Sequence, residues 1–208
     1  MSKAKLTYNN KEIELDVIEG TEEEKAIDIT KLRSQTGLIT MDPGYGNTGS
    51  CVSNITFIGG EKGILNYRGY PIDWLCENSN FVDVCHLLIY GKTDDINKKE
   101  KFRLSIRKHA TIPEDMKRFF DGFPSNAHPM AILSSMVTAL SAFHPNSDNF
   151  KEAAVDQNIV RLLAKVKTIA AYSYRKSHGL PFIYPDTELS YVDNFLHINL
   201  NEPPCVSI

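Results

Sequence analysis

The apolar and polar positions near the amino terminus alternate with the period of a strand. Ile13, Leu15 and Val17 are separated by acidic residues, which is typical of a half-buried strand. With residues 5–8 before a turn at Asn9-Asn10, this stretch predicts a β-hairpin. A short helix is expected near residues 28–32, ending before Gly37.

From Pro71 onward the apolar positions recur with the period of a helix. Ser79 or Asn80 can cap a helix that ends at Gly91. Thr111 and Glu114 form a capping box for a later helix, since a hydroxyl and a carboxylate at this spacing satisfy free amides at a helix start. Helices are therefore expected from Pro71 through Leu75, at 81–90, 98–109 and 114–120, at 129–143 and 158–178, and within 189–198.

Two of these helices, 129–143 and 158–178, are rich in apolar and small residues. The first contains no charged side chain, so we expect it to be buried on all sides, with its small residues allowing a neighbour to approach closely. Burial within one subunit and burial between two subunits would produce the same pattern.

These elements predict a mainly α protein: a helical array preceded by a small β-rich amino-terminal region. We expect the β-rich region to cover residues 1–66 and the helical region residues 67–208. No closing element follows the last expected helix, so the array is expected to be truncated.

Composition changes this picture little. Of the 208 residues, 42% are hydrophobic and 24% are charged, which is ordinary for a globular protein. The net charge of −3 gives no basic field for nucleic acid or an anionic membrane. No apolar run is long enough to span a bilayer, and no signal peptide is recognisable at the start. The cytoplasm is the expected location.

The four cysteines show no metal-binding or redox spacing. None forms a C-x-x-C pair, and no histidine completes a zinc motif. No metal site is therefore expected. Cys51, Cys76 and Cys85 are expected to be reduced, buried, small hydrophobic residues.

Residues 44–49 read G-x-G-x-x-G, which is the pattern of a dinucleotide-binding turn. Such a turn must be followed by a helix, whose amino terminus binds the phosphates. Residues 50–60 are instead rich in β-branched residues and end in glycines, which favours a strand and a turn. The glycines are therefore interpreted as turn residues.

Several short blocks, in order, resemble the citrate synthase family, and most closely its longer-chain bacterial type from Gram-negative organisms. The strongest is the run from Gly63 to Ile72, which includes Tyr67-Arg68-Gly69-Tyr70-Pro71. Supporting blocks are Asp42-Pro43-Gly44, Ser50-Cys51, His128-Pro129-Met130, residues 179–185 and residues 189–196. The resemblance covers nearly the whole chain and implies its amino-terminal portion.

The resemblance implies an acyltransferase of the tricarboxylic acid cycle, which condenses acetyl-coenzyme A with oxaloacetate. In the family an aspartate and two histidines carry the chemistry, with arginines holding the carboxylates. The histidine blocks resemble H-A-D-H-E-x-N and H-G-G-A-N, and neither occurs in this sequence. No catalytic residue is therefore assigned, and this chain is expected to be inactive alone.

A regulatory site is the second implication of the resemblance. Enzymes of this type bind NADH as an allosteric inhibitor, and the matching positions are Lys108, His109, Arg161, Lys165 and Cys205. Arg161 and Lys165 are like charges four residues apart, which an anionic partner would stabilise. A solvated basic edge is the alternative. His144 occupies a position where the family has a tyrosine.

The resemblance also implies that helices 129–143 and 158–178 pack across a subunit interface. A homodimer is therefore expected, and a hexamer is possible for the full-length enzyme. Three functions remain open from the residues: part of an enzyme, a non-catalytic oligomerisation or NADH-regulatory module, and a nucleotide-binding protein. The last would need a helix after Gly49.

Overall fold

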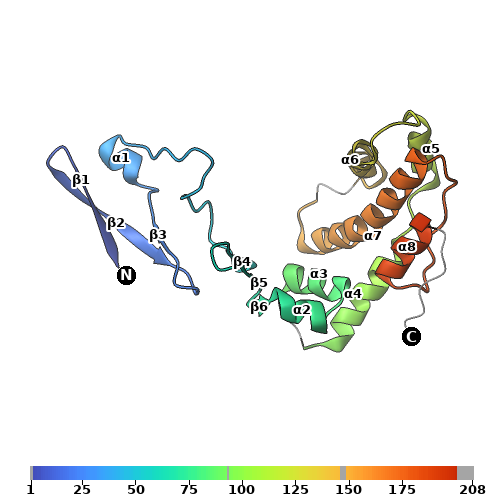
Figure 1. The fold of residues 1–208 in the computed structure, drawn as a ribbon, viewed down its shortest axis with the longest axis horizontal. Helices are drawn as coiled ribbons and strands as arrows, with labels where there is room; N and C mark the ends of the chain where they lie inside the picture. Colours follow the sequence, from blue (N-terminus) through green and yellow to red (C-terminus); the bar gives the residue numbers. More distant parts are fainter. Residues whose placement is uncertain (1, 93, 146–148, 201–208) are drawn as a thin grey trace. The chain divides into compact units, whose positions relative to one another are not determined.

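The computed structural model describes residues 2–92, 94–145 and 149–200 (Figure 1). The chain divides into two compact units, Met1–Asn54 and Ile55–Ile208, which are described separately. The boundary expected from the sequence was after residue 66. The division into compact units falls after Asn54, before the second sheet, whose strands contact the first helix of the following array; the boundary after residue 66 stays a prediction.

The first unit is built on a three-stranded antiparallel sheet in the order β1-β2-β3. Its first two strands form the predicted hairpin, in which Leu6 lies opposite Ile13. Asn9 and Asn10 both have positive φ, the conformation that a two-residue hairpin turn requires. The strands are β1 (Lys3–Tyr8), β2 (Lys11–Glu19) and β3 (Lys25–Ile27).

The short helix of this unit, α1 (Leu32–Thr36), begins later than predicted. The Asp28 carboxylate accepts hydrogen bonds from the amide and the hydroxyl of Thr30, at 2.8 and 2.5 Å. This local turn competes with helix formation, so residues 28–31 stay outside the helix. The predicted stop at Gly37 is confirmed, with φ at 77°.

Residues 50–60, directly after the glycine-rich loop at residues 44–49, form no helix. The Asp42 carboxylate accepts from the Asn47 amide and the Thr48 hydroxyl, at 2.8 and 2.6 Å, and these bonds hold the pKa of Asp42 below its usual value. The next element is β4 (Thr56–Gly59), which is shorter than the strand predicted there. Gly44, at φ 85°, and Gly46 lie in turns as interpreted, whereas Gly49 lies outside them.

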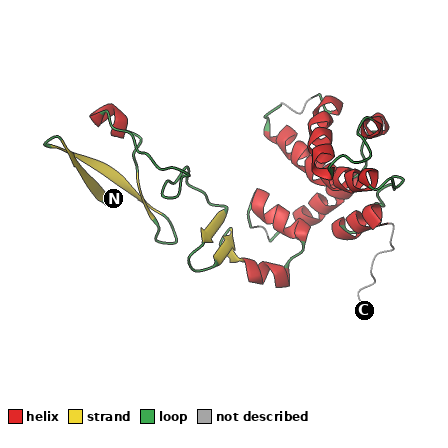
Figure 2. Cartoon of the chain, turned by 45° about the horizontal axis from the view of Figure 1, so that its top comes forward, coloured by secondary structure: helices red, strands yellow, loops and turns green. Residues whose placement is uncertain are grey.

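The second unit opens with an antiparallel sheet that leads into α2 (Ile72–Asn78), and Figure 2 shows these strands directly before the helix. Arg68, at φ 52°, donates a hydrogen bond to the Leu88 carbonyl at 2.9 Å. Gly69 follows at φ 84°. The strands are β4, β5 (Ile64–Tyr67) and β6 (Tyr70–Pro71).

A helical array forms the rest of this unit, as predicted, and α6 lies beside α7 in Figure 1. The Asn80 side chain caps α3 (Phe81–Tyr90), and that of Asp95 caps α4 (Ile96–Lys108), which begins two residues before its predicted start. The helices are α3 (Phe81–Tyr90), α4 (Ile96–Lys108), α5 (Glu114–Asp121), α6 (Pro129–Ala139) with a 3₁₀ turn (Leu140–Phe143), α7 (Glu152–Ser177) and α8 (Tyr191–Leu200).

The capping box predicted at Thr111 and Glu114 does not form. Pro113 occupies the N-cap position of α5, and no side chain caps this helix. The Thr111 carbonyl instead accepts a hydrogen bond from Lys165 of α7. A tertiary contact therefore sets the backbone here in place of the local motif.

Two clusters of buried residues hold the array together. The larger lies between α5, α6, α7 and α8. Phe120 and Tyr172 are buried in it, and the partly buried Phe182 stacks on Tyr172 and meets Phe120 edge-on. The smaller joins α3, α4 and α7 through Val82, Phe102, Ile106, Val160 and Ala164. The mainly α fold with small sheets is confirmed.

The prediction that residues 129–143 are buried on all sides is wrong for the single chain. Only Ile132, Met136 and Leu140 are buried, at the spacing of one helix face. The opposite face exposes Ser134, Thr138 and their small neighbours. Composition could not separate the two faces, because both are uncharged.

The cysteine prediction is also wrong in part. Cys51 and Cys76 are exposed, while Cys85 is half-buried, and all three are free thiols. Burial raises the pKa of the Cys85 thiol. Among the described residues no group of three metal-ligating side chains forms a metal site, and none of the described helices is both long and apolar enough to cross a membrane.

Candidate functional site

The four described residues of the predicted regulatory set gather where the end of α4 meets α7. The Lys165 ammonium donates to the carbonyls of His109, at 3.2 Å, and of Thr111. Thr168, one turn further on, donates to the Ala110 carbonyl at 2.7 Å. Three consecutive carbonyls are thus bound by one face of α7, so Lys165 holds the α4–α5 connection in place.

Lys165 is only 6% exposed, and burial, followed by the nearby Arg161 charge, lowers its pKa. Arg161 lies one turn earlier and lines a cavity of about 140 Å³ between α6, the 3₁₀ turn and α7. His144 also lines this cavity. Its Nε2 is buried without a hydrogen-bond partner among the described residues.

The imidazole of His144 is kept neutral by its surroundings. Burial lowers its pKa first, and the charges of Arg161, Lys165 and His109 lower it further. His109 itself uses Nδ1 in a 2.8 Å contact with the Ser105 carbonyl. The cavity is therefore basic, with Arg161 as its principal cation and a neutral imidazole beside it.

The structure brings together Arg161, Lys165 and His109, but it does not give them equal roles. Lys165 is engaged with backbone carbonyls, whereas Arg161 faces the cavity. Lys108 is exposed at the end of α4. Cys205 lies outside the described residues. The sequence analysis singled out His144 only as a departure from the family, although it lines the cavity.

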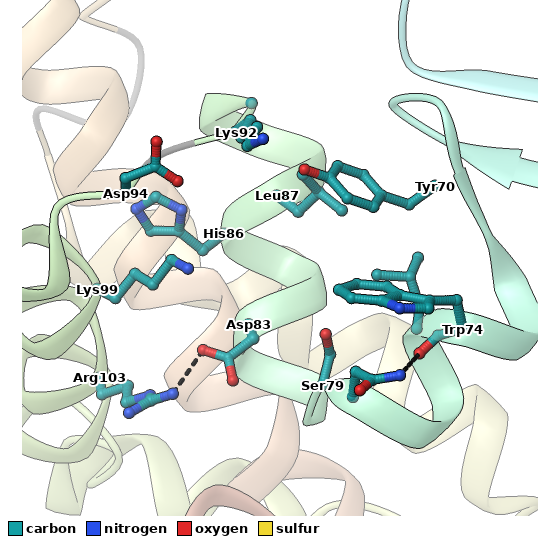
Figure 3. Close-up of a pocket in the computed structure, with 13 residues that line it drawn as sticks. Tyr70, Trp74, Ser79, Asp83, His86, Leu87, Lys92, Asp94, Lys99 and Arg103 are labelled. Atoms are coloured by element: carbon teal, nitrogen blue, oxygen red, sulfur yellow. Dashed lines mark hydrogen bonds and ion pairs between the residues drawn. The ribbon is translucent and has the colours of Figure 1, made fainter.

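A second cavity, of about 300 Å³, lies among β6, α2, α3 and α4, and sequence analysis did not find it (Figure 3). Tyr70 and Trp74 form one wall, with their rings stacked at 5.3 Å. Lys99 and Arg103 lie on the opposite side in Figure 3. Asp83 of α3 lies between these two sides of the cavity, and its carboxylate forms an ion pair with Arg103 at 2.6 Å.

In the second cavity, burial and the charges of Lys99 and Asp83 act on the pKa of His86. His86 is 5% exposed, and burial lowers its pKa, with the Lys99 charge adding to the effect and Asp83 opposing it. A signal for this cavity was present in the sequence. Lys99 and Arg103 are like charges four residues apart, as are Arg161 and Lys165. Earlier in the chain, the aromatic residues Tyr70 and Trp74 are also four residues apart.

The comparisons with known proteins identify one family. The family model described as "Citrate synthase, C-terminal domain" matches residues 44–205. A citrate synthase 1 of Mycobacterium tuberculosis is 48% identical over 201 residues, which are 96% of this chain and 47% of that protein. A citrate synthase of Corynebacterium glutamicum is 45% identical over 203 residues, 97% of this chain and 46% of that protein.

Solved structures agree with this result. The crystal structure of citrate synthase from Pyrobaculum aerophilum matches with a TM-score of 0.71 and 25% identity, over 92% of this chain and 46% of that one. The chain thus spans about half the length of the curated relatives it matches. On the family model and on these identities, the chain belongs to the citrate synthase family.

Proposed function

We propose that this chain is the amino-terminal half of a citrate synthase, the enzyme that condenses acetyl-coenzyme A with oxaloacetate to give citrate and coenzyme A. The observation that carries the proposal is the 48% identity to a citrate synthase across nearly the whole chain, over only 47% of that relative's length. The proposed subtype is the longer-chain bacterial type found in Gram-negative organisms.

The chain alone is proposed to be inactive. The proposal rests on the six histidines, His86, His109, His128, His144, His178 and His197, none of which has the flanking residues of the family's catalytic blocks. Without a base for the acetyl group and a donor for the oxaloacetate carbonyl, condensation has no general acid–base catalysis.

The test is a coenzyme A release assay with purified chain, acetyl-coenzyme A and oxaloacetate. We expect no release above a protein-free control. The matched positive control is the same assay with the full-length gene product, which includes any downstream coding sequence and is purified in the same way. Turnover by the 208-residue chain would contradict the assignment of catalysis to residues outside it.

We propose further that α6 and α7 form a homodimer interface, with a hexamer possible for the full-length enzyme. The exposed face of α6 supports this, because its hydroxyls are satisfied within the helix. Ser134 and Ser135 donate to the Ala131 carbonyl, and Thr138 donates to the Ser134 carbonyl. Such a face can be buried without losing a hydrogen bond.

Sedimentation at micromolar concentration is expected to give a dimer. Ser135→Arg on the exposed face of α6 should shift the sample to monomer, because it places an unpaired charge in the interface. Lys101→Gln, on the exposed face of α4, is the matched control and should remain dimeric. A wild-type monomer would contradict the proposal.

A second candidate is a regulatory module in which the basic residues beside the small cavity at Arg161 bind a phosphate of NADH. Its support is the juxtaposition of Arg161, Lys165, His109 and His144, with Lys108 at the exposed end of α4. An arginine facing a cavity suits a phosphate, whereas Lys165 acts from behind by fixing the α4–α5 connection. Cys205 is the remaining residue of the proposed set.

Equilibrium dialysis against NADH tests the regulatory proposal. We expect saturable binding that Arg161→Gln weakens by about tenfold, the loss expected for one charge-assisted hydrogen bond. Arg118→Gln, on a side chain that is 83% exposed in α5, should leave binding unchanged. Equal affinities for the two variants would exclude Arg161 from the site.

A further inference from the structure

The cavity among β6, α2, α3 and α4 combines an aromatic wall with an excess of positive charge. Trp74 is 46% exposed, so part of its ring is open to a ligand, and Tyr70 stacks against it. Leu75 and Leu87 add apolar surface to the lining. A flat, apolar ring therefore has a matching surface in this cavity.

Among the ionised groups that line the cavity, Lys99 differs from the others in its contacts. Three cations, Lys92, Lys99 and Arg103, face two carboxylates, Asp83 and Asp94. Arg103 is already bound to Asp83 at 2.6 Å. Lys92 lies 5.9 Å from the centre of the Tyr70 ring, and contact with Tyr70, aided by the Asp94 charge, raises its pKa.

The Lys99 ammonium has no ion pair or hydrogen bond with the described part of the chain. It lies close enough to His86 to lower the pKa of that imidazole, so His86 adds no second charge. In Figure 3 Lys99 lies across the cavity from Trp74. The lining therefore offers the unpaired positive charge of Lys99 opposite an aromatic face, while Lys92, which has no ion pair with the described residues either, contacts the Tyr70 ring.

We propose that this cavity binds a small aromatic monocarboxylate. Its ring would lie against Trp74 and Leu87, and its carboxylate would accept a hydrogen bond from the Lys99 ammonium. The carboxylates of Asp83 and Asp94 disfavour a dianion such as a phosphate monoester, because they would repel its second negative charge. The volume of about 300 Å³ is at the lower end for ligand pockets, which restricts the ligand to a small molecule.

Trp74 makes the proposal directly measurable, because it is the only tryptophan in the chain. Its fluorescence therefore reports on this cavity alone. We expect 3-phenylpropanoate to change the Trp74 emission saturably. The neutral 3-phenylpropanamide and the ringless hexanoate should each bind at least about tenfold more weakly than 3-phenylpropanoate, since each lacks one of the two recognised groups.

Lys99→Gln should weaken 3-phenylpropanoate binding by about tenfold while leaving the amide unaffected. Lys101→Gln, which removes the same charge from an exposed position of α4, is the matched control and should bind like wild type. Circular dichroism of both variants verifies the helices, and the acid–amide comparison on the unmodified chain needs no variant. Unsaturable emission, equal binding of acid and amide, or equal affinities of the two variants would overturn the proposal.

Discussion

Arg175→Met is expected to lower the free energy of unfolding of the helical unit by about 3 kcal/mol, the cost of leaving three carbonyls at a largely buried site without their charged donor. Arg175 is 4% exposed in α7. Its Nε donates to the Pro181 carbonyl, and its Nη1 donates to those of Asn199, at 2.9 Å, and Ile198, at 3.4 Å.

The clamp formed by Arg175 joins three parts of the chain. It binds the loop after α7 and the last carbonyls of α8, where the helix dipole favours a cation. Methionine fills similar space but donates no hydrogen bond. The loss should therefore be concentrated in α8, which packs through Ile198 into the larger core.

Urea unfolding followed by circular dichroism measures this effect, and hydrogen exchange locates it. We expect a lower midpoint and faster exchange of the α8 amides. Arg118→Met, at an exposed position of α5, is the control and should change stability by less than about 0.5 kcal/mol. Midpoints that agree between the two variants would show that the Arg175 hydrogen bonds contribute no net stability.

Lys167 is expected to give the second large effect, with the opposite sign. It is 4% exposed, and its ammonium lies 4.7 Å from the centre of the Tyr191 ring. Burial, followed by the Arg107 charge, lowers the pKa of Lys167 from 10.5 to about 8. The charged form is therefore disfavoured in the folded state.

The pH dependence follows from this lowered pKa. Below about pH 8 both states are protonated, and the folded state bears the full cost of the buried charge. Between about 8 and 10.5 the folded state loses the proton first, so stability rises with pH by about 3 kcal/mol in total, at 1.36 kcal/mol for each unit of pKa difference. Lys165, whose pKa burial also lowers, acts in the same direction.

Tyr191 sets the upper limit of this rise. Burial raises the pKa of its phenol from 10.0 to about 12, so the folded state keeps the neutral form. Its contribution is fully present below pH 10 and is lost as the pH rises toward 12, because the unfolded state ionises first. Maximum stability is therefore expected slightly above pH 10, where the loss from Tyr191 begins to offset the remaining gain from Lys167.

Lys167→Met should remove the part of the rise that Lys167 causes, leaving only that of Lys165. It should also stabilise the protein at pH 7 by about 2 kcal/mol, after the loss of about 1 kcal/mol of cation–π attraction. Thermal unfolding across pH 7 to 10 measures both effects. Lys101→Met, at an exposed site, should leave the pH profile unchanged. A profile for Lys167→Met that parallels the wild type would contradict the lowered pKa.

Much of the secondary structure could be predicted from local sequence, because the signals act over a few residues. The Asn9-Asn10 turn, the Asn80 cap and the stop at Gly91 all formed as expected. Thr111 is the informative failure. Its capping box satisfies the local rule, yet Lys165 and Thr168 bind the carbonyls of residues 109–111, and α5 begins after Pro113 instead.

The uncharged helix at residues 129–143 marks another limit of composition. Its pattern correctly predicted a helix, but not which face is buried, because the exposed serines and threonine satisfy their own hydroxyls on the helix backbone. Cys51 and Cys76 are exposed for a related reason. Residue type gives only an average tendency to be buried, and their neighbours in space decide the outcome.

The sequence by itself determined the element order, the mainly helical fold and, through blocks such as the run from Gly63 to Ile72, the family. Only the tertiary structure decided what each basic residue does. Lys165 and Lys99 each lie four residues from another cation, Arg161 and Arg103 respectively. Lys165 nevertheless binds a carbonyl 56 positions away, whereas Lys99 faces an open cavity. The physical reason is that the energy of a charge depends on burial and on the groups that face it, and these come from distant parts of the chain.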